Sequence, residues 1–181
     1  VNGYTMRYGK LEHPAGVRGF ARRMWDGILS AGVSCWGYGN DDMHTDGRND
    51  APAGPFTAWM QIWAEKLAVD DVLQALQTGS FYASTGVSVS SLTLENGDLC
   101  VTTENANRIR FIGRGGRSLL EIESKEGDYT IRGDEGYIRV ECESEQLRWP
   151  DEQPELVQWS FCQPLWIIGE DQKMPEGLSL S

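Results

Sequence analysis

The sequence predicts an α+β fold, with an α/β unit over residues 1–80 and an antiparallel β-sandwich over residues 81–181. Helical and strand-like patterns alternate up to residue 80, which is typical of a parallel sheet. About seven short strand-like runs follow at spacings of roughly 8–12 residues, without a helical pattern, as in β-sandwiches. The charge changes at the same place, because residues 1–80 carry a net charge of -2 and residues 81–181 a net charge of -9.

The first unit contains two predicted helices. Apolar residues recur at spacings of three and four over residues 17–29, which predicts an amphipathic helix. Strand-like runs follow over 33–38 and 56–64. A second helix is predicted from Asp70 or Asp71, either of which can cap it, to Gly79, which ends it.

The second unit is predicted to consist of short strands separated by glycine-rich turns. Asn96-Gly97 lies between two alternating runs and is a strong signal for a two-residue hairpin turn. The strand-like runs cover residues 91–95, 99–103, 108–112, 119–123, 129–132, 137–143 and 157–168.

Composition excludes several classes of protein. No apolar run approaches the roughly 18–20 residues that span a bilayer, so a membrane protein is not expected. A net charge of -11 repels phosphate backbones, so binding of nucleic acid by charge attraction is not expected either. The four cysteines form no CxxC pair and no cluster with histidine, which predicts reduced thiols and a cytoplasmic protein. One disulfide between strands stays open as an alternative.

Asp42 and His44 are the candidate metal ligands. The pair follows a predicted strand, and active sites gather in such loops of α/β folds. Side chains two residues apart in an extended segment point to the same side, so the carboxylate and the imidazole can reach one divalent ion, Zn²⁺, Mn²⁺ or Fe²⁺. The alternative is a polar surface loop, because Asp-x-His alone is a common sequence.

Longer stretches around this pair resemble the PHP superfamily, the polymerase and histidinol phosphatase metal-dependent phosphoesterases, in its carbaryl-hydrolase-like branch. In that branch a Trp-Asp helix leads to a strand and then to Asp-Asp-x-His. The most specific stretch is Phe-Tyr-Ala-Ser-Thr-Gly, and the resemblance covers most of the chain. The matching residues are 25–32, 39–44, 73–86, 109–113 and 159–164.

The resemblance implies that residues 1–80 are the last strands and helices of a distorted (βα)7 barrel. In this family two or three divalent metals activate a water that attacks a small phosphoester. Asp42 and His44 would be the last metal ligands, and Asp41 would orient a ligand or cap the loop. Ser84 and Thr85 could contact a phosphate oxygen, although such a run more often ends a strand at Gly86.

The chain also departs from the family pattern. It has no His-x-His motif, which supplies the first ligands in such proteins, and His13 more simply reads as a loop residue than as a ligand. The chain therefore looks like the C-terminal portion of such an enzyme and is expected to be inactive alone. An opened barrel would leave a bare strand edge and helix face, which predicts a homo-oligomer. The alternative function is a non-enzymatic β-sandwich module that binds a protein or a glycan.

Overall fold

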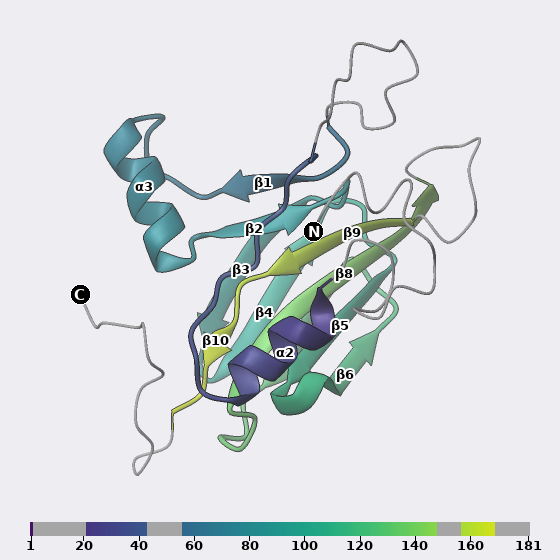
Figure 1. Cartoon of the computed structure of the whole chain (residues 1–181). Helices are drawn as coiled ribbons and strands as arrows, with labels where there is room; N and C mark the ends of the chain where they lie inside the picture. The colour runs from purple at the N-terminus through teal and green to yellow at the C-terminus, as the bar shows by residue number, and fades with distance from the viewer. Residues whose placement is uncertain (2–20, 43–55, 148–156, 169–181) are drawn as a thin grey trace.

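Two antiparallel sheets form the centre of the molecule (Figure 1). The computed structural model describes residues 1, 21–42, 56–147 and 157–168. One sheet has seven strands in the order β1-β2-β9-β8-β5-β6, with β10 also paired to β8, and the other has the order β3-β4-β7. The described elements, in chain order, are α2 (Arg22–Ser30), β1 (Trp59–Ile62), α3 (Val69–Thr78), β2 (Phe81–Ser84), β3 (Val89–Glu95), β4 (Asp98–Thr103), β5 (Arg108–Gly113), the 3-10 turn η1 (Arg114–Gly116), β6 (Arg117–Ile122), β7 (Glu126–Thr130), β8 (Tyr137–Leu147), β9 (Val157–Cys162) and β10 (Leu165–Trp166).

The predicted (βα)7 barrel is wrong. Every strand pair in the described residues is antiparallel, and the sheets do not close into a barrel. The chain leaves β1, forms α3, and reverses at Gly79 in the left-handed conformation, φ 79°. β2 therefore returns beside β1 in the opposite direction, with Trp59 opposite Ser84 and Ile62 opposite Phe81. A β-sandwich-like arrangement of the two sheets is compatible with the structure.

The predicted helix end and hairpin turn were more accurate than the predicted parallel pairing of strands in residues 1–80. The second helix ends before Gly79 as predicted, but Ala68 precedes it and no side chain caps it. Asp70 and Asp71 lie in its first turn, where the helix dipole favours negative charge. The predicted strand over 33–38 forms no ladder, whereas the hairpin turn at Asn96-Gly97 is present, with φ 53° and 89°.

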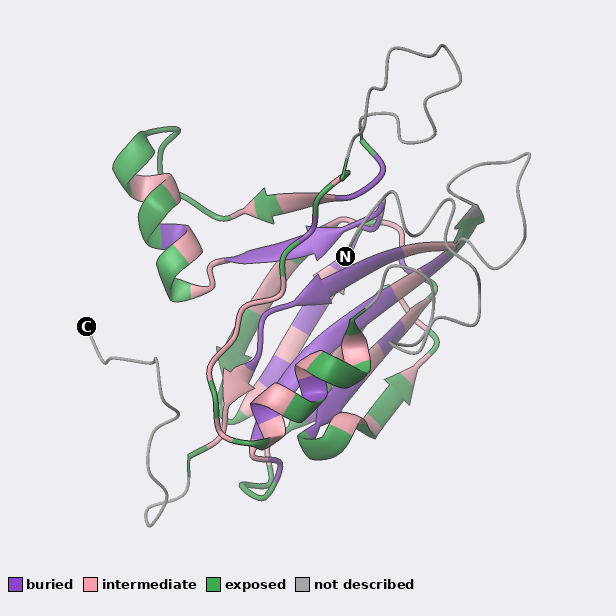
Figure 2. Cartoon of the chain, in the orientation of Figure 1, coloured by how far each residue is buried: buried purple, intermediate pink, exposed green. Residues whose placement is uncertain are grey.

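A hydrophobic core lies between the two sheets (Figure 2). Alternate residues of the long strands point into it, because successive side chains of a strand face opposite sides. Burial raises the pKa of the Cys142 thiol to about 12, so this thiol stays protonated at neutral pH. All four cysteines are free thiols. The fully buried core residues include Phe111, Ile109, Ile138, Val140, Cys142 and Cys162.

The boundary predicted near residue 80 falls between α3 and β2, whereas β1 and β2 are neighbours in one sheet. Neither α2 nor α3 is long and apolar enough to cross a membrane, and the same holds for every other helical part of the described residues.

Candidate functional site

The loop that contains Asp41 is fastened to the beginning of β1. The Asp41 carboxylate accepts hydrogen bonds from the backbone N–H of Phe56 at 2.9 Å, of Thr57 at 2.6 Å and of Ala58 at 2.9 Å. It also accepts a hydrogen bond at 2.8 Å from the Thr57 hydroxyl. Both carboxylate oxygens are occupied in this way, so the contacts of Asp41 are those of a loop cap rather than of a metal ligand.

These hydrogen bonds also set the charge state of Asp41. Burial by itself would raise the pKa of this carboxyl, because it disfavours the charged form. The hydrogen bonds from Ala58, Thr57 and Phe56 outweigh burial and hold the pKa below its ordinary value. The carboxylate is therefore ionised at neutral pH, and the N–H groups that it accepts from have a charged partner.

Asp42 follows directly and is exposed, with its backbone in the left-handed region at φ 49°. Few residues other than glycine adopt this conformation, and it turns the chain sharply after the fixed Asp41. His44 and His13, the other candidate ligands, lie outside the described residues. Within the described residues no three His, Cys, Asp or Glu side chains come together in a group that could hold a metal ion.

Ser84 and Thr85 lie at the same end of the large sheet as the Asp41 loop, because Ser84 is opposite Trp59 at the beginning of β1. Both residues are buried. The Ser84 hydroxyl donates to Val87 O at 2.8 Å and accepts from Gly86 N at 3.0 Å. The Thr85 hydroxyl accepts from Trp159 N at 2.8 Å. Both hydroxyls thus bind backbone groups that shape the turn and join it to β9.

Gly39 allows the loop to lie close to the sheet. A Cβ atom at this buried position would lie 2.6 Å from Trp59 O and 3.2 Å from the Ala83 Cβ, and the first distance is too short for any side chain. We expect Gly39→Ala to lower the free energy of unfolding by about 1–3 kcal/mol, as overpacking does. Urea denaturation would measure the loss. Gly27→Ala, where nothing lies within 4 Å of the added atom, is the matched control and should not destabilise the protein.

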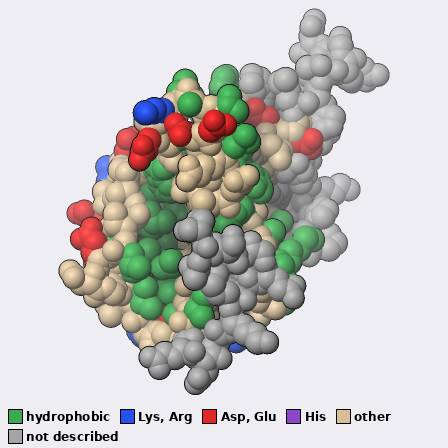
Figure 3. Space-filling view, turned by 90° about the vertical axis from the view of Figure 1, so that its left-hand side faces the viewer, with side chains coloured by type: hydrophobic (Ala, Val, Ile, Leu, Met, Phe, Trp, Pro, Cys, Tyr) green, Lys and Arg blue, Asp and Glu red, His purple; other side chains and the backbone are tan. Residues whose placement is uncertain are grey.

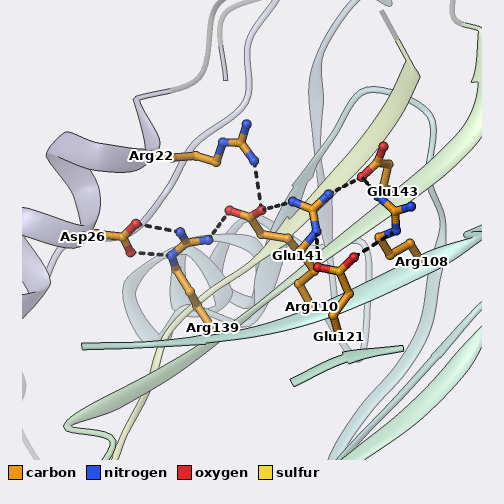
Figure 4. Close-up of polar contacts among 8 residues, drawn as sticks. All are labelled: Arg22, Asp26, Arg108, Arg110, Glu121, Arg139, Glu141 and Glu143. Atoms are coloured by element: carbon orange, nitrogen blue, oxygen red, sulfur yellow. Dashed lines mark hydrogen bonds and ion pairs between the residues drawn. The ribbon is translucent and has the colours of Figure 1, made fainter. Parts of the chain in front are cut away.

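A network of charged side chains covers the other face of the large sheet, beneath α2 (Figure 4). Arg139 on β8 donates two hydrogen bonds of 2.8 Å to the two carboxylate oxygens of Asp26 on α2. It donates a third, of 2.5 Å, to Glu141. Arg22 of α2 also donates to Glu141, at 3.0 Å. Helix α2 is therefore held on the sheet by ion pairs as well as by apolar contacts.

The network continues across three strands. Arg110 on β5 lies opposite Glu141 on one side and Glu121 on the other, and it donates a hydrogen bond to Glu143. Opposite charges directly across neighbouring strands attract each other. Arg108 extends the row with an ion pair of 3.2 Å to Glu121. Four arginines thus alternate with four carboxylates, which leaves this face close to electrical neutrality.

Aromatic side chains join the network to its surroundings. The guanidinium groups of Arg22 and Arg110 lie 5.0 Å and 4.9 Å from the ring centroid of Trp159, within the range of cation–π attraction. The Tyr137 hydroxyl donates to Asp26 at 2.8 Å. Burial and this hydrogen bond to a carboxylate raise the pKa of Tyr137 to about 12. Tyr137 therefore remains a hydrogen-bond donor at neutral pH.

Little in the amino-acid sequence indicates this network. Glu141 and Glu143 belong to an acidic run that is most simply read as a solvated surface, yet Glu141 is only 2% exposed. The available signal was a charged residue at every second position, with Arg139, Glu141 and Glu143 in one run and Arg108 and Arg110 in another. The arrangement is suited to fixing α2, and a polar hollow of about 260 Å³ lies beside Arg108 and Glu143 at its other end. No protein-family model, no curated protein and no solved structure matches this chain.

Proposed function

We propose that Asp42 and His44 are ligands of a divalent metal in a phosphoesterase, and that this chain does not complete the site alone. The observation that supports the proposal is the attachment of Asp41 to residues 56–58, which fixes the backbone immediately before Asp42. A metal site needs a rigid backbone beside each ligand residue, because the ligand positions must be held to a fraction of an ångström.

The donor set fits such a metal only in part. A carboxylate and an imidazole suit Zn²⁺, Mn²⁺ or Fe²⁺. The described residues contribute Asp42 and no group of three ligands, so further ligands must come from elsewhere. A bound metal would polarise the phosphoryl oxygen and lower the pKa of its water. Asp41 would hold the loop, and Asp42 would hold the metal.

A second copy of the chain is one source of the missing ligands, so the predicted homo-oligomer becomes part of this proposal. The substrate would be a small phosphoester, since a net charge of -11 disfavours a nucleic acid.

Calorimetric titration of the purified chain with Mn²⁺, at two protein concentrations, tests the proposal. We expect saturable binding that Asp42→Ala and His44→Ala each weaken by at least about tenfold, since even residues that only orient ligands contribute that much. Asp134→Ala, which removes an exposed carboxylate from a turn, is the matched control and should bind as the unmodified chain does.

Equal binding by the unmodified chain and Asp42→Ala would overturn the proposal. So would the absence of Mn²⁺ binding at both protein concentrations. Circular dichroism of each variant would show that a loss of binding does not arise from unfolding.

A further inference from the structure

The β3 strand lies at an edge of the three-stranded sheet. Among the described residues it pairs with β4 alone, and β7 lies on the far side of β4. From Ser91 to Glu95 the pairing with β4 is regular, and the one irregularity precedes Ser91. This stretch contains no lysine and no proline, the residues that commonly protect edge strands from further pairing. A regular, unprotected edge can therefore accept another strand.

A hollow of about 200 Å³ runs along this edge. Leu92, Thr93 and Leu94, three consecutive residues of β3, all line it. Leu92 and Leu94 share one face of the sheet with Leu99 of β4, which also lines the hollow, whereas Thr93 points to the other face, so the hollow opens at the edge of β3. The opposite wall includes Trp63, which directly follows β1, Phe81 of β2 and Leu165 of β10. We call this hollow and its edge the β3 groove.

The walls of the β3 groove are mainly apolar and partly open to solvent. Leu94 is 57% exposed and Trp63 is 37% exposed, which is unusual for large apolar side chains so close together. Figure 3 shows hydrophobic side chains gathered in a hollow on this side of the molecule. The Gln163 amide, also in the wall, accepts from Gly37 N at 2.7 Å and donates to Gly37 O at 2.8 Å, so it is held in place.

Acidic side chains lie at the borders of the groove. Glu95 and Asp98 face each other at the hairpin that follows Leu94. At the other border, Glu65 and Asp71 line a neighbouring hollow that shares Trp63 and Thr78 with the groove. Negative charge around an apolar groove favours a ligand with positive charge near its apolar part.

We propose that the β3 groove binds an extended segment of a partner protein in which apolar residues alternate with polar ones and basic residues flank them. The segment adds a strand to β3, so that its backbone pairs with the edge and every second side chain enters the hollow. Its lysines or arginines lie near the acidic borders. This proposal is independent of the metal site.

A fluorescently labelled peptide, Lys-Val-Thr-Val-Thr-Val-Lys with blocked ends, is the probe. Fluorescence anisotropy should show saturable binding. Leu94→Lys, which places a charge in the groove at a mostly exposed position, should weaken binding by at least about tenfold, as the loss of a central contact does. Leu120→Lys on the β6 edge, where the leucine is 36% exposed, is the matched control and should bind normally.

Two further peptides test the mode of binding. A central proline removes a backbone N–H and should abolish binding, and glutamate in place of both lysines should weaken it. Equal affinity for the parent and proline peptides would overturn strand addition, and no saturation by about 1 mM would overturn the groove as a peptide site. Binding of a neutral oligosaccharide in place of the peptide would also overturn it.

Discussion

Arg139→Met is expected to lower the free energy of unfolding by about 3–5 kcal/mol, the usual cost of removing one partner from a buried ion pair. Arg139 is 2% exposed, and it is the partner of both Asp26 and Glu141. Without it, Asp26 loses two hydrogen bonds and both carboxylates keep a buried negative charge. Burial alone would lower the pKa of Arg139, but its hydrogen bonds to Asp26 and the charge of Glu141 raise it above the ordinary value. Urea denaturation at pH 7 measures the loss.

The same substitution at Arg108 is the control for this prediction. Arg108 lies on the same face and pairs with Glu121, but the two side chains are 38% and 46% exposed. Exposed pairs contribute about 0–1 kcal/mol, so Arg108→Met should be nearly neutral. If Arg139→Met does not fold, Arg139→Lys should fold with a smaller loss of unfolding free energy. Lysine keeps the positive charge but cannot make the bidentate hydrogen bonds to Asp26. A loss below about 1 kcal/mol for Arg139→Met would contradict the assignment of the network as the fastening of α2.

The contrast between these two arginines explains why the network escapes sequence analysis. On β8 the alternating pattern places apolar residues in the core and charged residues on the other face, as in a strand with one face in water. Nothing local shows that α2 covers part of that face. Asp26 and Arg139 are 113 positions apart, so their pairing is a property of the fold.

Predictions that depend on local chemistry were the more reliable ones. Asn96-Gly97 forms its hairpin because both residues adopt positive φ, and Gly79 ends α3 for the same reason. The direction of strand pairing depends on distant parts of the chain, and there the prediction of a parallel α/β unit was wrong. Helix and strand patterns alternate in residues 56–84, yet the two strands run antiparallel.

At the candidate site, too, the local sequence reveals one part of the arrangement and distant contacts determine the other. The resemblance suggested that Asp41 orients a ligand or caps the loop, and the position of Asp41 beside Asp42 is visible in the sequence. Its partners are 15 to 17 residues away, across a segment whose path the sequence does not reveal. The number of hydrogen bonds that Asp41 accepts, and hence the rigidity of the backbone before Asp42, could therefore come only from the structure.

Asp41→Asn is expected to lower the free energy of unfolding by about 1–3 kcal/mol at pH 7. The substitution replaces one acceptor oxygen with an NH₂ donor and removes the negative charge that strengthens the remaining hydrogen bonds. Thr57 and Ala58 are each 2% exposed, so water cannot easily replace the lost partner of their N–H groups. Chemical denaturation of the two proteins over a range of pH measures the difference. Thr93→Val, which removes an exposed hydroxyl on β3, is a control for an ordinary polar loss and should be nearly neutral.

The pH dependence of this stability difference distinguishes stabilisation by the charge of Asp41 from stabilisation by hydrogen bonding alone. The folded pKa of Asp41 lies below its ordinary value of 3.8, so its stabilisation is fully present above about pH 5 and is lost as the pH falls through the folded pKa. Asparagine does not titrate, so the stability difference between the two proteins should shrink below pH 4. Hydrogen bonds from backbone N–H groups also hold the pKa of Glu135 low, despite its burial, but Glu135 is present in both proteins and cancels in the difference. A difference that stays constant down to pH 2 would show that the charge of Asp41 does not hold the loop, and it would remove the support for a rigid approach to Asp42.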